Sequence, residues 1–250
     1  MSKRKEFNDA GVINQVLKIR QDLPVIGGKK LHYLLRKTLL RSGHTCLGRD
    51  RLFDLLREHN LLIKRKRKYA ITTNSNHPFK KYGNLVKSIS VRRNNQLWVS
   101  DITYVRVNNN FAYLSLITDV NSRMIVGYHL SDSLALKGTY TALKNALKVA
   151  KPEIHHSDRG SQYCSHKYTK ELKRHKVKIS MTQDGNCYDN AIAERVNGIL
   201  KQQFGLDSRF RNFENAKLAV KQAVKSYNYL RPHWSLQLMV PAEVYFKATG

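Results

Sequence analysis

Hydrophobic side chains recur at helical spacing in three stretches near the start of the chain. The apolar positions are Val12, Val16 and Ile19, then Leu31, Leu34, Leu35 and Leu39, and then Leu52, Phe53, Leu55 and Leu56. Spacings of three and four residues place such side chains on one helix face, so the pattern predicts helices over 8–20, 28–41 and 49–59. The helix-breaking residues Pro24, Gly27, Gly43 and Gly48 stand between these stretches.

A basic run, Lys64-Arg65-Lys66-Arg67-Lys68, follows the third stretch. Three short helices that lead into a cationic segment are typical of a helix-turn-helix-like DNA-binding domain, which we predict over 1–69. A helical dimerisation module fits the same pattern. Residues 70–94 show no sustained period and contain Asn, Ser, Pro and Gly, so they are predicted to be a linker.

From Gln96 onward the helical period gives way to partly alternating segments rich in β-branched and aromatic residues. The segments 98–107, 111–120 and 123–131 are separated by compact turns and predict an antiparallel meander. We then expect a helix over 136–149, a strand over 153–156, a helix over 166–175 and a strand over 178–182. Helices over 189–204 and 213–229 are predicted to close the chain.

The net charge of the chain indicates the kind of molecule that it binds. The 250 residues include 45 Lys and Arg against 18 Asp and Glu, a formal net charge of +27. Self-repulsion on that scale destabilises a compact state unless a polyanion offsets it, so the composition favours a nucleic-acid partner. The run at 64–68, taken alone, is equally typical of a solvated tail.

Cysteine and hydropathy exclude several classes of protein. Cys46, Cys164 and Cys187 are odd in number and form no C-x-x-C pair, which argues against a disulfide framework and a zinc finger. No apolar run has membrane-spanning length, and the start MSKRKEFNDAG has no apolar signal region. We therefore expect a cytoplasmic protein without membrane contact.

Three carboxylates stand at different structural transitions. Asp101 lies in QLWVSDITYVRV, Asp158 in EIHHSDRGSQY, and Glu194 in CYDNAIAERVNGILKQQF, with 35 residues between the last two. Three carboxylates brought together by a fold are the usual protein contribution to a two-magnesium site for phosphoryl transfer. Each one alone is equally typical of a surface or capping residue, so the prediction rests on their combination.

The motifs WVSDITYV, HHSDRGSQY, GNCYDNAIAERVNGILK and YNYLRPHWSLQLMVPAEVY occur in this order. They resemble the second open reading frame product (OrfB) of insertion-sequence-three transposases, which belong to the DDE transposase and retroviral-integrase superfamily. The resemblance covers about Gly28 to Tyr245. It implies an α/β fold, with a ribonuclease H-like (integrase/transposase) core of five mixed strands flanked by helices over 95–205. A C-terminal helical extension over 206–250 follows, and a small all-α helix-turn-helix-like domain precedes the core.

The resemblance also implies a reaction. Asp101, Asp158 and Glu194 would be catalytic and would bind two Mg²⁺ ions, or Mn²⁺ in their place, for cleavage of DNA and joining of a 3′-hydroxyl. The implied partners are double-stranded DNA (element ends and target), further copies of the chain on DNA, and a first-frame (OrfA) product or a fusion with it in the bacterial nucleoid. A catalytically silent DNA-binding regulator and a structure-specific nuclease of the same fold remain alternatives.

Other residues are assigned by their position relative to these carboxylates. Lys201 stands seven residues after Glu194, two turns along the same helix face, and is predicted to contact a DNA phosphate; a solvated lysine is the alternative. Asp119 and Asp189 are predicted to cap a turn and a helix. The predicted DNA contacts are completed by Arg159, Asn190, Lys64, Arg65, Lys66, Arg67 and Lys68.

Overall fold

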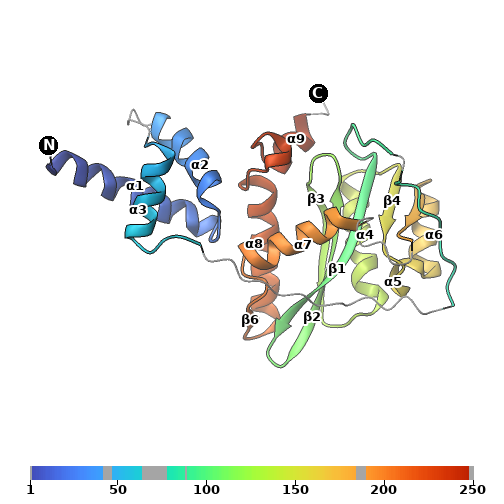
Figure 1. The fold of residues 1–250 in the computed structure, drawn as a ribbon. Helices are drawn as coiled ribbons and strands as arrows, with labels where there is room; N and C mark the ends of the chain where they lie inside the picture. Colours follow the sequence, from blue (N-terminus) through green and yellow to red (C-terminus); the bar gives the residue numbers. More distant parts are fainter. Residues whose placement is uncertain (1, 42–46, 64–77, 88, 184–189, 248–250) are drawn as a thin grey trace. The chain divides into compact units, whose positions relative to one another are not determined.

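The computed structural model describes residues 2–41, 47–63, 78–87, 89–183 and 190–247 (Figure 1). The chain forms two compact units, one of residues 1–68 with 202–204 and the other of residues 69–201 and 205–250. The predicted basic run at 64–68 and the predicted helix cap Asp189 lie outside the described residues. No helix in the described ranges is both long and apolar enough to cross a membrane.

The first unit contains the three predicted helices, α1 (Ser2–Asp22), α2 (Gly28–Arg41) and α3 (Arg49–Glu58). They pack on one another around a small apolar core of Val12, Val16, Leu23, Ile26, Leu31, Leu35, Leu52, Leu55 and Leu56. Gly28 permits the close contact between α2 and α3, because a Cβ there would stand 2.6 Å from the Phe53 ring. The predicted helical region is thus confirmed, with α1 longer than its periodic segment.

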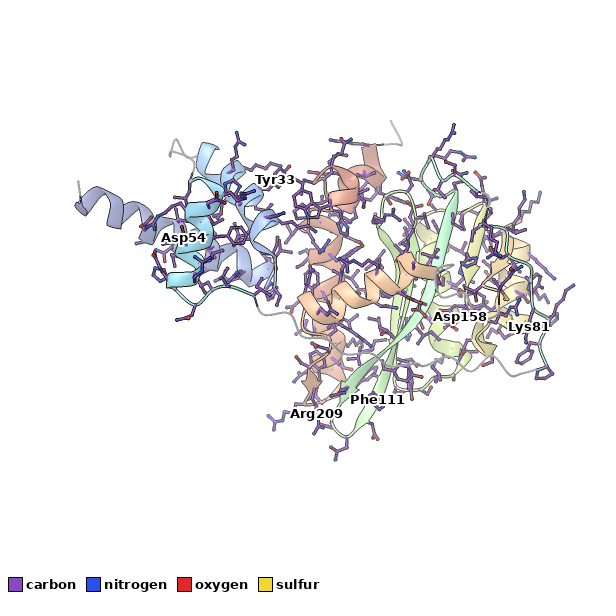
Figure 2. The ribbon with its side chains drawn as sticks, viewed as in Figure 1. Tyr33, Asp54, Lys81, Phe111, Asp158 and Arg209 are labelled. Carbon is purple, nitrogen blue, oxygen red and sulfur yellow. The ribbon has the colours of Figure 1, made fainter. Side chains whose placement is uncertain are left out.

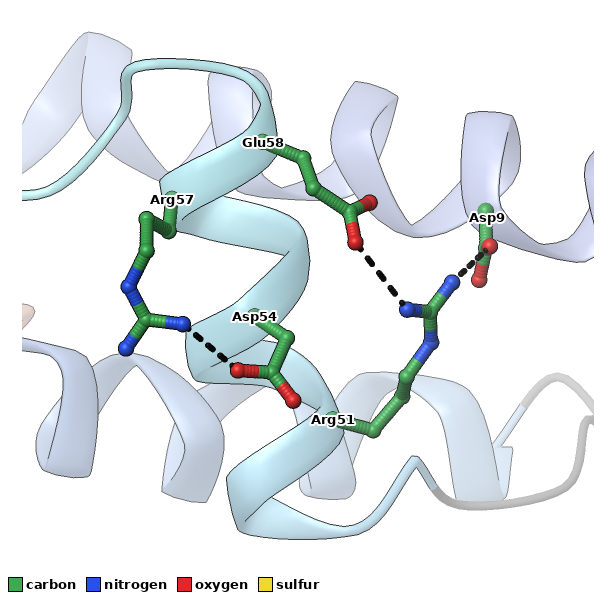
Figure 3. A network of polar contacts seen from close by, with 5 residues as sticks. All are labelled: Asp9, Arg51, Asp54, Arg57 and Glu58. Carbon is green, nitrogen blue, oxygen red and sulfur yellow. Dashed lines mark hydrogen bonds and ion pairs between the residues drawn. The ribbon is translucent and has the colours of Figure 1, made fainter.

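Charged side chains join α1 and α3 at the surface of this unit (Figure 3). Arg51 donates to Asp9 and to Glu58, and Arg57 donates to Asp54 at 2.6 Å. Exposed ion pairs contribute little net free energy, typically below about 1 kcal/mol. The apolar core therefore holds the three helices together, and the ion pairs help to orient α3 against α1.

The second unit is built on one mixed sheet with the strand order β3-β2-β1-β4-β5. The predicted meander is confirmed, because β1 (Leu97–Val107), β2 (Asn110–Asp119) and β3 (Ile125–Ser131) pair antiparallel in sequence. The parallel half consists of β4 (Ile154–Ser157) and β5 (Lys178–Met181). A two-residue strand that the pattern did not predict, β6 (Arg209–Phe210), pairs parallel with the end of β1.

Helices cover both faces of this sheet (Figure 1). On one face lie α4 (Leu136–Val149), α5 (Ser161–Cys164) and α6 (His166–Arg174), which bury Trp98 and Ile117 beneath them. On the other face lie α7 (Ala191–Gln203) and α8 (Phe213–Tyr229). A short turn of 3₁₀ helix (Trp234–Leu236) and α9 (Pro241–Lys247) complete the chain.

The described part of the predicted linker lies against the core. It contains neither helix nor strand over 78–87 and 89–94. Tyr82 nevertheless packs on the core beneath α4 and α6, while Val86 and Ile89 pack on the opposite face. Leu85 N also donates to Ser180 Oγ of β5 at 2.8 Å. This part of the segment is therefore attached to the sheet.

Asp119 has the turn-capping role that the sequence predicts. Its side chain is fully buried at the end of β2. Its Oδ1 accepts from Ser122 N at 2.8 Å and from Ser122 Oγ at 2.6 Å, and its Oδ2 accepts from Asn95 N at 2.7 Å. One carboxylate therefore fixes both the β2–β3 turn and the entry to β1.

The C-terminal helices hold the start of the central strand β1 and the edge strand β3. Tyr245 OH of α9 and Trp98 Nε1 of β1 both donate to Asn95 Oδ1, at 2.8 and 3.0 Å. Asn228 of α8 accepts from Ile125 N at 3.0 Å and donates to Ile125 O at 2.9 Å. Because β3 is an edge strand, this pairing satisfies backbone groups that would otherwise be open to another chain.

We predict that Asp119→Ala lowers the free energy of unfolding by about 3 kcal/mol, because it leaves three donors without their acceptor. The burial that raises the pKa of Asp119 offsets part of this stabilisation in the wild type. Urea denaturation of the variant beside Asp132→Ala, an exposed aspartate, measures the effect. Equal small losses in both variants would contradict the capping role.

Candidate active site

The strand register brings two of the predicted carboxylates together. β1 and β4 run parallel with Val99 opposite His156. Two further residues along each strand place Asp101 opposite Asp158, which directly follows the end of β4. Since side chains alternate between the faces of a sheet, both carboxylates share the face of Val99, the one covered by α7. Figure 2 labels Asp158 in this region.

Both oxygens of the Asp101 carboxylate accept hydrogen bonds. Ile102 N donates to Oδ1 at 2.9 Å, and Asn197 Nδ2 of α7 donates to Oδ2 at 2.7 Å. The Asp158 side chain is held by its own loop, where Gly160 N donates to its Oδ1 at 2.9 Å. Local backbone groups and one distant amide therefore fix the direction of these carboxylates.

The electrostatics of Asp101 show that Glu194 is also near. Burial raises the pKa of Asp101 to about 7, and the neighbouring charges of Asp158 and, more weakly, Glu194 raise it as well. The hydrogen bonds from Ile102 and Asn197 act in the opposite direction. The register thus sets Asp158 beside Asp101, and the charge of Glu194, exposed on α7, acts on Asp101 from a greater distance.

One polar face of α7 lies along β1. Asn190, Glu194, Asn197 and Lys201 follow one another at spacings of four, three and four residues, which keeps them on one side of the helix. Asn190 Nδ2 donates to Ser100 O at 3.1 Å, and Asn197 donates to the neighbouring Asp101. Two buried amides on either side of Glu194 therefore attach α7 to the strand.

This arrangement changes the interpretation of two residues. Asn190, predicted to touch DNA, is buried and uses its amide within the protein, while Asn197 was missed by the sequence analysis. The helical spacing of Asn190, Glu194 and Asn197 was the available signal, but it does not say which strand faces the helix.

Two predicted cationic contacts lie near the carboxylates. Lys201 is partly buried; burial lowers its pKa, while the charges of Asp101 and Asp207 favour its protonated form. Lys201 is therefore within electrostatic range of Asp101. Arg159 follows Asp158 in the loop after β4 and is also partly buried.

A buried polar cluster supports β1 from the opposite face. His155 Nε2 lies 2.7 Å from Ser100 Oγ and 3.0 Å from Tyr168 OH, and burial lowers the pKa of His155 to about 3. On the α7 face, the neighbouring His156 places its Nδ1 2.8 Å from Ser180 Oγ of β5. His155 is therefore neutral, and both histidines are packed strand residues whose rings hydrogen-bond to neighbouring elements.

The donor set fits a hard divalent cation. Within the described ranges, no three His, Cys, Asp or Glu side chains are close enough to hold an ion as they stand. Glu194 is exposed, however, and an exposed side chain changes rotamer rapidly. Carboxylate oxygens suit Mg²⁺ and Mn²⁺, and a cation would offset the clustered negative charge that disfavours ionised Asp101.

The chain is similar to known proteins over most of its length. Two family models, each described as an integrase core domain, match residues 91–187 and 175–241. The chain is 38% identical over 211 residues to a 31 kDa protein of insertion element IS600 from Shigella sonnei, covering 82% of this chain and 78% of that protein.

Two named transposases are also similar over shorter regions. Identity is 37% over 163 residues with the transposase of insertion sequence IS629 from Shigella sonnei, covering 63% of this chain and 55% of that protein. It is 33% over 183 residues with the transposase InsF of IS3A from Escherichia coli K12, covering 71% of this chain and 64% of that protein. The chain therefore spans less than two thirds of either transposase.

Solved structures share the fold. The HTLV-2 integrase catalytic core matches with a TM-score of 0.51 at 19% identity, covering 61% of this chain and 97% of that one. A chain of the simian T-cell lymphotropic virus intasome matches with a TM-score of 0.54 at 19% identity, covering 88% and 74%. The predicted ribonuclease H-like fold class is confirmed.

We predict that Asn197→Ala shifts the acid limb of any activity that needs ionised Asp101 toward higher pH. The amide lowers the pKa of Asp101, so its removal leaves the carboxyl protonated to a higher pH. Activity against pH, together with the magnesium concentration for half-maximal activity, measures the change. Asn145→Ala serves as the control, because it removes a side-chain amide that donates to the backbone carbonyl of Tyr128 and to no carboxylate. An unmoved profile with reduced stability alone would leave Asn197 a purely structural residue.

Proposed function

Since the chain belongs to the insertion-sequence-three family of DDE transposases, with an integrase core, we propose that it cleaves DNA at the ends of an insertion element and joins the 3′-hydroxyl to target DNA. One observation carries the proposal. The parallel register sets Asp101 beside Asp158, and the charges of Asp158 and Glu194 both act on Asp101.

The three carboxylates would hold two divalent cations between the protein and the scissile phosphate. Such ions activate the attacking oxygen and neutralise the leaving oxygen of an in-line displacement. Magnesium is supported by the HTLV-2 integrase core, which was solved in complex with that metal. Water is the proposed nucleophile in cleavage, and a DNA 3′-hydroxyl is the proposed nucleophile in joining.

The protein's own part in the reaction is to position groups. Ile102 N and Asn197 fix the two oxygens of Asp101, which keeps its lone pairs directed before any ligand enters. Lys201 would hold a phosphate of the bound DNA end on the same helix face, so that the scissile bond stays aligned. Arg159 would add a second phosphate contact next to Asp158.

The proposed substrates and partners follow from charge and family. A net charge of +27 suits double-stranded DNA of the element ends and the target, with the run at 64–68 as a contact of little sequence preference. We propose that several copies assemble on DNA in the bacterial nucleoid, with a first-frame product, or a fusion with it, recognising the ends.

We expect Asp101→Ala, Asp158→Ala and Glu194→Ala each to abolish cleavage and strand transfer while DNA binding persists, because each variant removes an ion ligand. The assay uses a matched end sequence with magnesium or manganese. Calcium should support binding without efficient chemistry, since it tolerates looser coordination than the octahedral magnesium site.

Each alternative function has its own outcome in this assay. Binding without any chemistry in the wild type would indicate a catalytically silent regulator. Cleavage without joining would indicate a nuclease of the same fold. Near-normal transfer by any one variant would remove that residue from the site, and robust cleavage in excess chelator would exclude the metal mechanism.

We predict that Lys201→Ala lowers end-specific joining well beyond its effect on bulk DNA affinity, and that Lys201→Arg retains much of the activity. Lys201 is partly buried within range of Asp101, whereas Lys217 on α8 is exposed. Joining at saturating DNA is compared with Lys217→Ala, which removes the same charge. Equal, slight losses in both variants would make Lys201 an ordinary solvated lysine.

A further inference from the structure

The connection between β1 and β2 carries a group of side chains that the proposed chemistry does not use. Arg106 of β1 is paired with Phe111 of β2 and with Arg209 of β6. Directly paired residues share one face of a sheet, and neighbouring strands lie about 4.8 Å apart. The three side chains therefore form a row across three strands. This row and the turn Asn108–Asn110 are named the hairpin patch.

The row is open to solvent and its aromatic ring is supported from behind. Arg106 and Arg209 are exposed, and Phe111 is 49% exposed. The Tyr104 ring lies edge-on to Phe111, with centroids 5.7 Å apart and an interplanar angle of 86°. Single exposed apolar residues are common on proteins, but this ring is held in place, with Arg106 beside it in the row and Arg209 beyond Arg106. Figure 2 labels Phe111 and Arg209 at this end of the sheet.

The hairpin patch surrounds a small hollow. Its volume is about 240 Å³, and its lining is Arg106, Asn108, Asn109, Asn110, Phe111 and Arg209. Asn108 N donates to Phe210 O at 2.8 Å, which ties β6 to the turn and keeps Arg209 beside Arg106. None of these lining residues is acidic, and no described carboxylate forms an ion pair with either arginine. Pockets that bind drug-sized apolar molecules are larger and mostly hydrophobic, so this hollow suits a different class of ligand.

We propose that the hairpin patch binds an unpaired strand of DNA, with one base against the Phe111 ring and the adjoining phosphates on Arg106 and Arg209. Proteins bind single strands by combining cations along the backbone with aromatic rings under the bases. The carboxamides of the turn are suited to base edges. A duplex keeps its bases stacked and would bring only phosphates to the arginines, so it would leave the ring unused.

The hairpin patch is distinct from the carboxylate site. Arg106 lies five residues beyond Asp101 on β1, about 17 Å at 3.3 Å per residue, and on the opposite face. Lys201 is within electrostatic range of both Asp101 and Arg106. A strand that passes Lys201 after leaving the scissile phosphate would therefore meet cations on its way to the patch. The inference rests on the proposed function, because it takes the substrate to be DNA.

The test compares two DNAs with the full chain in chelator, so that no chemistry occurs. One is a duplex with a single-stranded flank, and the other is the same duplex with blunt ends; fluorescence anisotropy gives both affinities. Phe111→Ala should weaken binding of the flanked duplex about tenfold and leave the blunt duplex nearly unchanged. Phe111→Trp should retain the affinity. Phe79→Ala, at a residue 44% exposed elsewhere, is the matched control.

Charge removal and crosslinking give independent readouts. The pair Arg106→Gln/Arg209→Gln should weaken the flanked duplex more than Lys144→Gln/Lys148→Gln, which removes two exposed charges from α4. A flank carrying 5-iododeoxyuridine should crosslink on irradiation to the wild-type peptide that contains Phe111.

Several results would overturn the inference. They are equal losses in the two double variants, equal effects of Phe111→Ala on both DNAs, and a crosslink to another peptide. A change of oligomer mass in Phe111→Ala with both affinities intact would assign the patch to a protein partner. Strand transfer by the wild type is assayed in parallel. Its absence, with flank binding as expected, would reject the proposed function while leaving the strand-binding site.

Discussion

Carboxylates that repel one another need the rest of a structure to hold them together, and the second unit meets that need around Asp101. Burial and the charges of Asp158 and Glu194 raise its pKa to about 7, above an unfolded value near 3.9. The native state therefore binds the proton more tightly, so ionisation of Asp101 destabilises the fold progressively as pH rises between these values. A divalent cation bound at the proposed site would remove this penalty and would thereby link metal binding to stability.

The parts that oppose the repulsion come from separate elements. The sheet fixes the backbones of Asp101 and Asp158 through the register of β1 and β4. The amides of Asn190 and Asn197 attach α7 to β1 on either side of Glu194. Behind the strand, neutral His155 lies between Ser100 and Tyr168, so support of the site adds no further charge to it. Exposed Glu194 keeps the rotational freedom that the two aspartates lack.

The sequence predicted those features that local chemistry decides. Periodicity located α4 and α8 to the residue, and Asp119 was recognised as a cap because turn chemistry is short-range. The fold class came from the motifs taken together. The sequence did not predict the features that depend on long-range pairing. β6 has only two residues, and Asn197 donates to Asp101, which lies 96 positions away on β1. Asn190 was assigned to DNA because sequence does not show which polar side chains become buried.

The segment predicted as a linker has no period, yet its scattered apolar residues Tyr82, Val86 and Ile89 dock on the sheet.

The hydrogen bond from Tyr245 to Asn95 spans 150 positions, and this separation affects how the chain folds during its synthesis. A chain emerging from the ribosome folds from its N-terminal end, and contacts of long sequence separation form late because loop closure must precede them. The entry to β1 thus acquires its last support only when α9 has been synthesised. Nascent chains that stop short of α9 would expose the Trp98 end of the central strand, which makes them targets for chaperones and proteases. Completion of translation would then precede the final anchoring of the strand that carries Asp101.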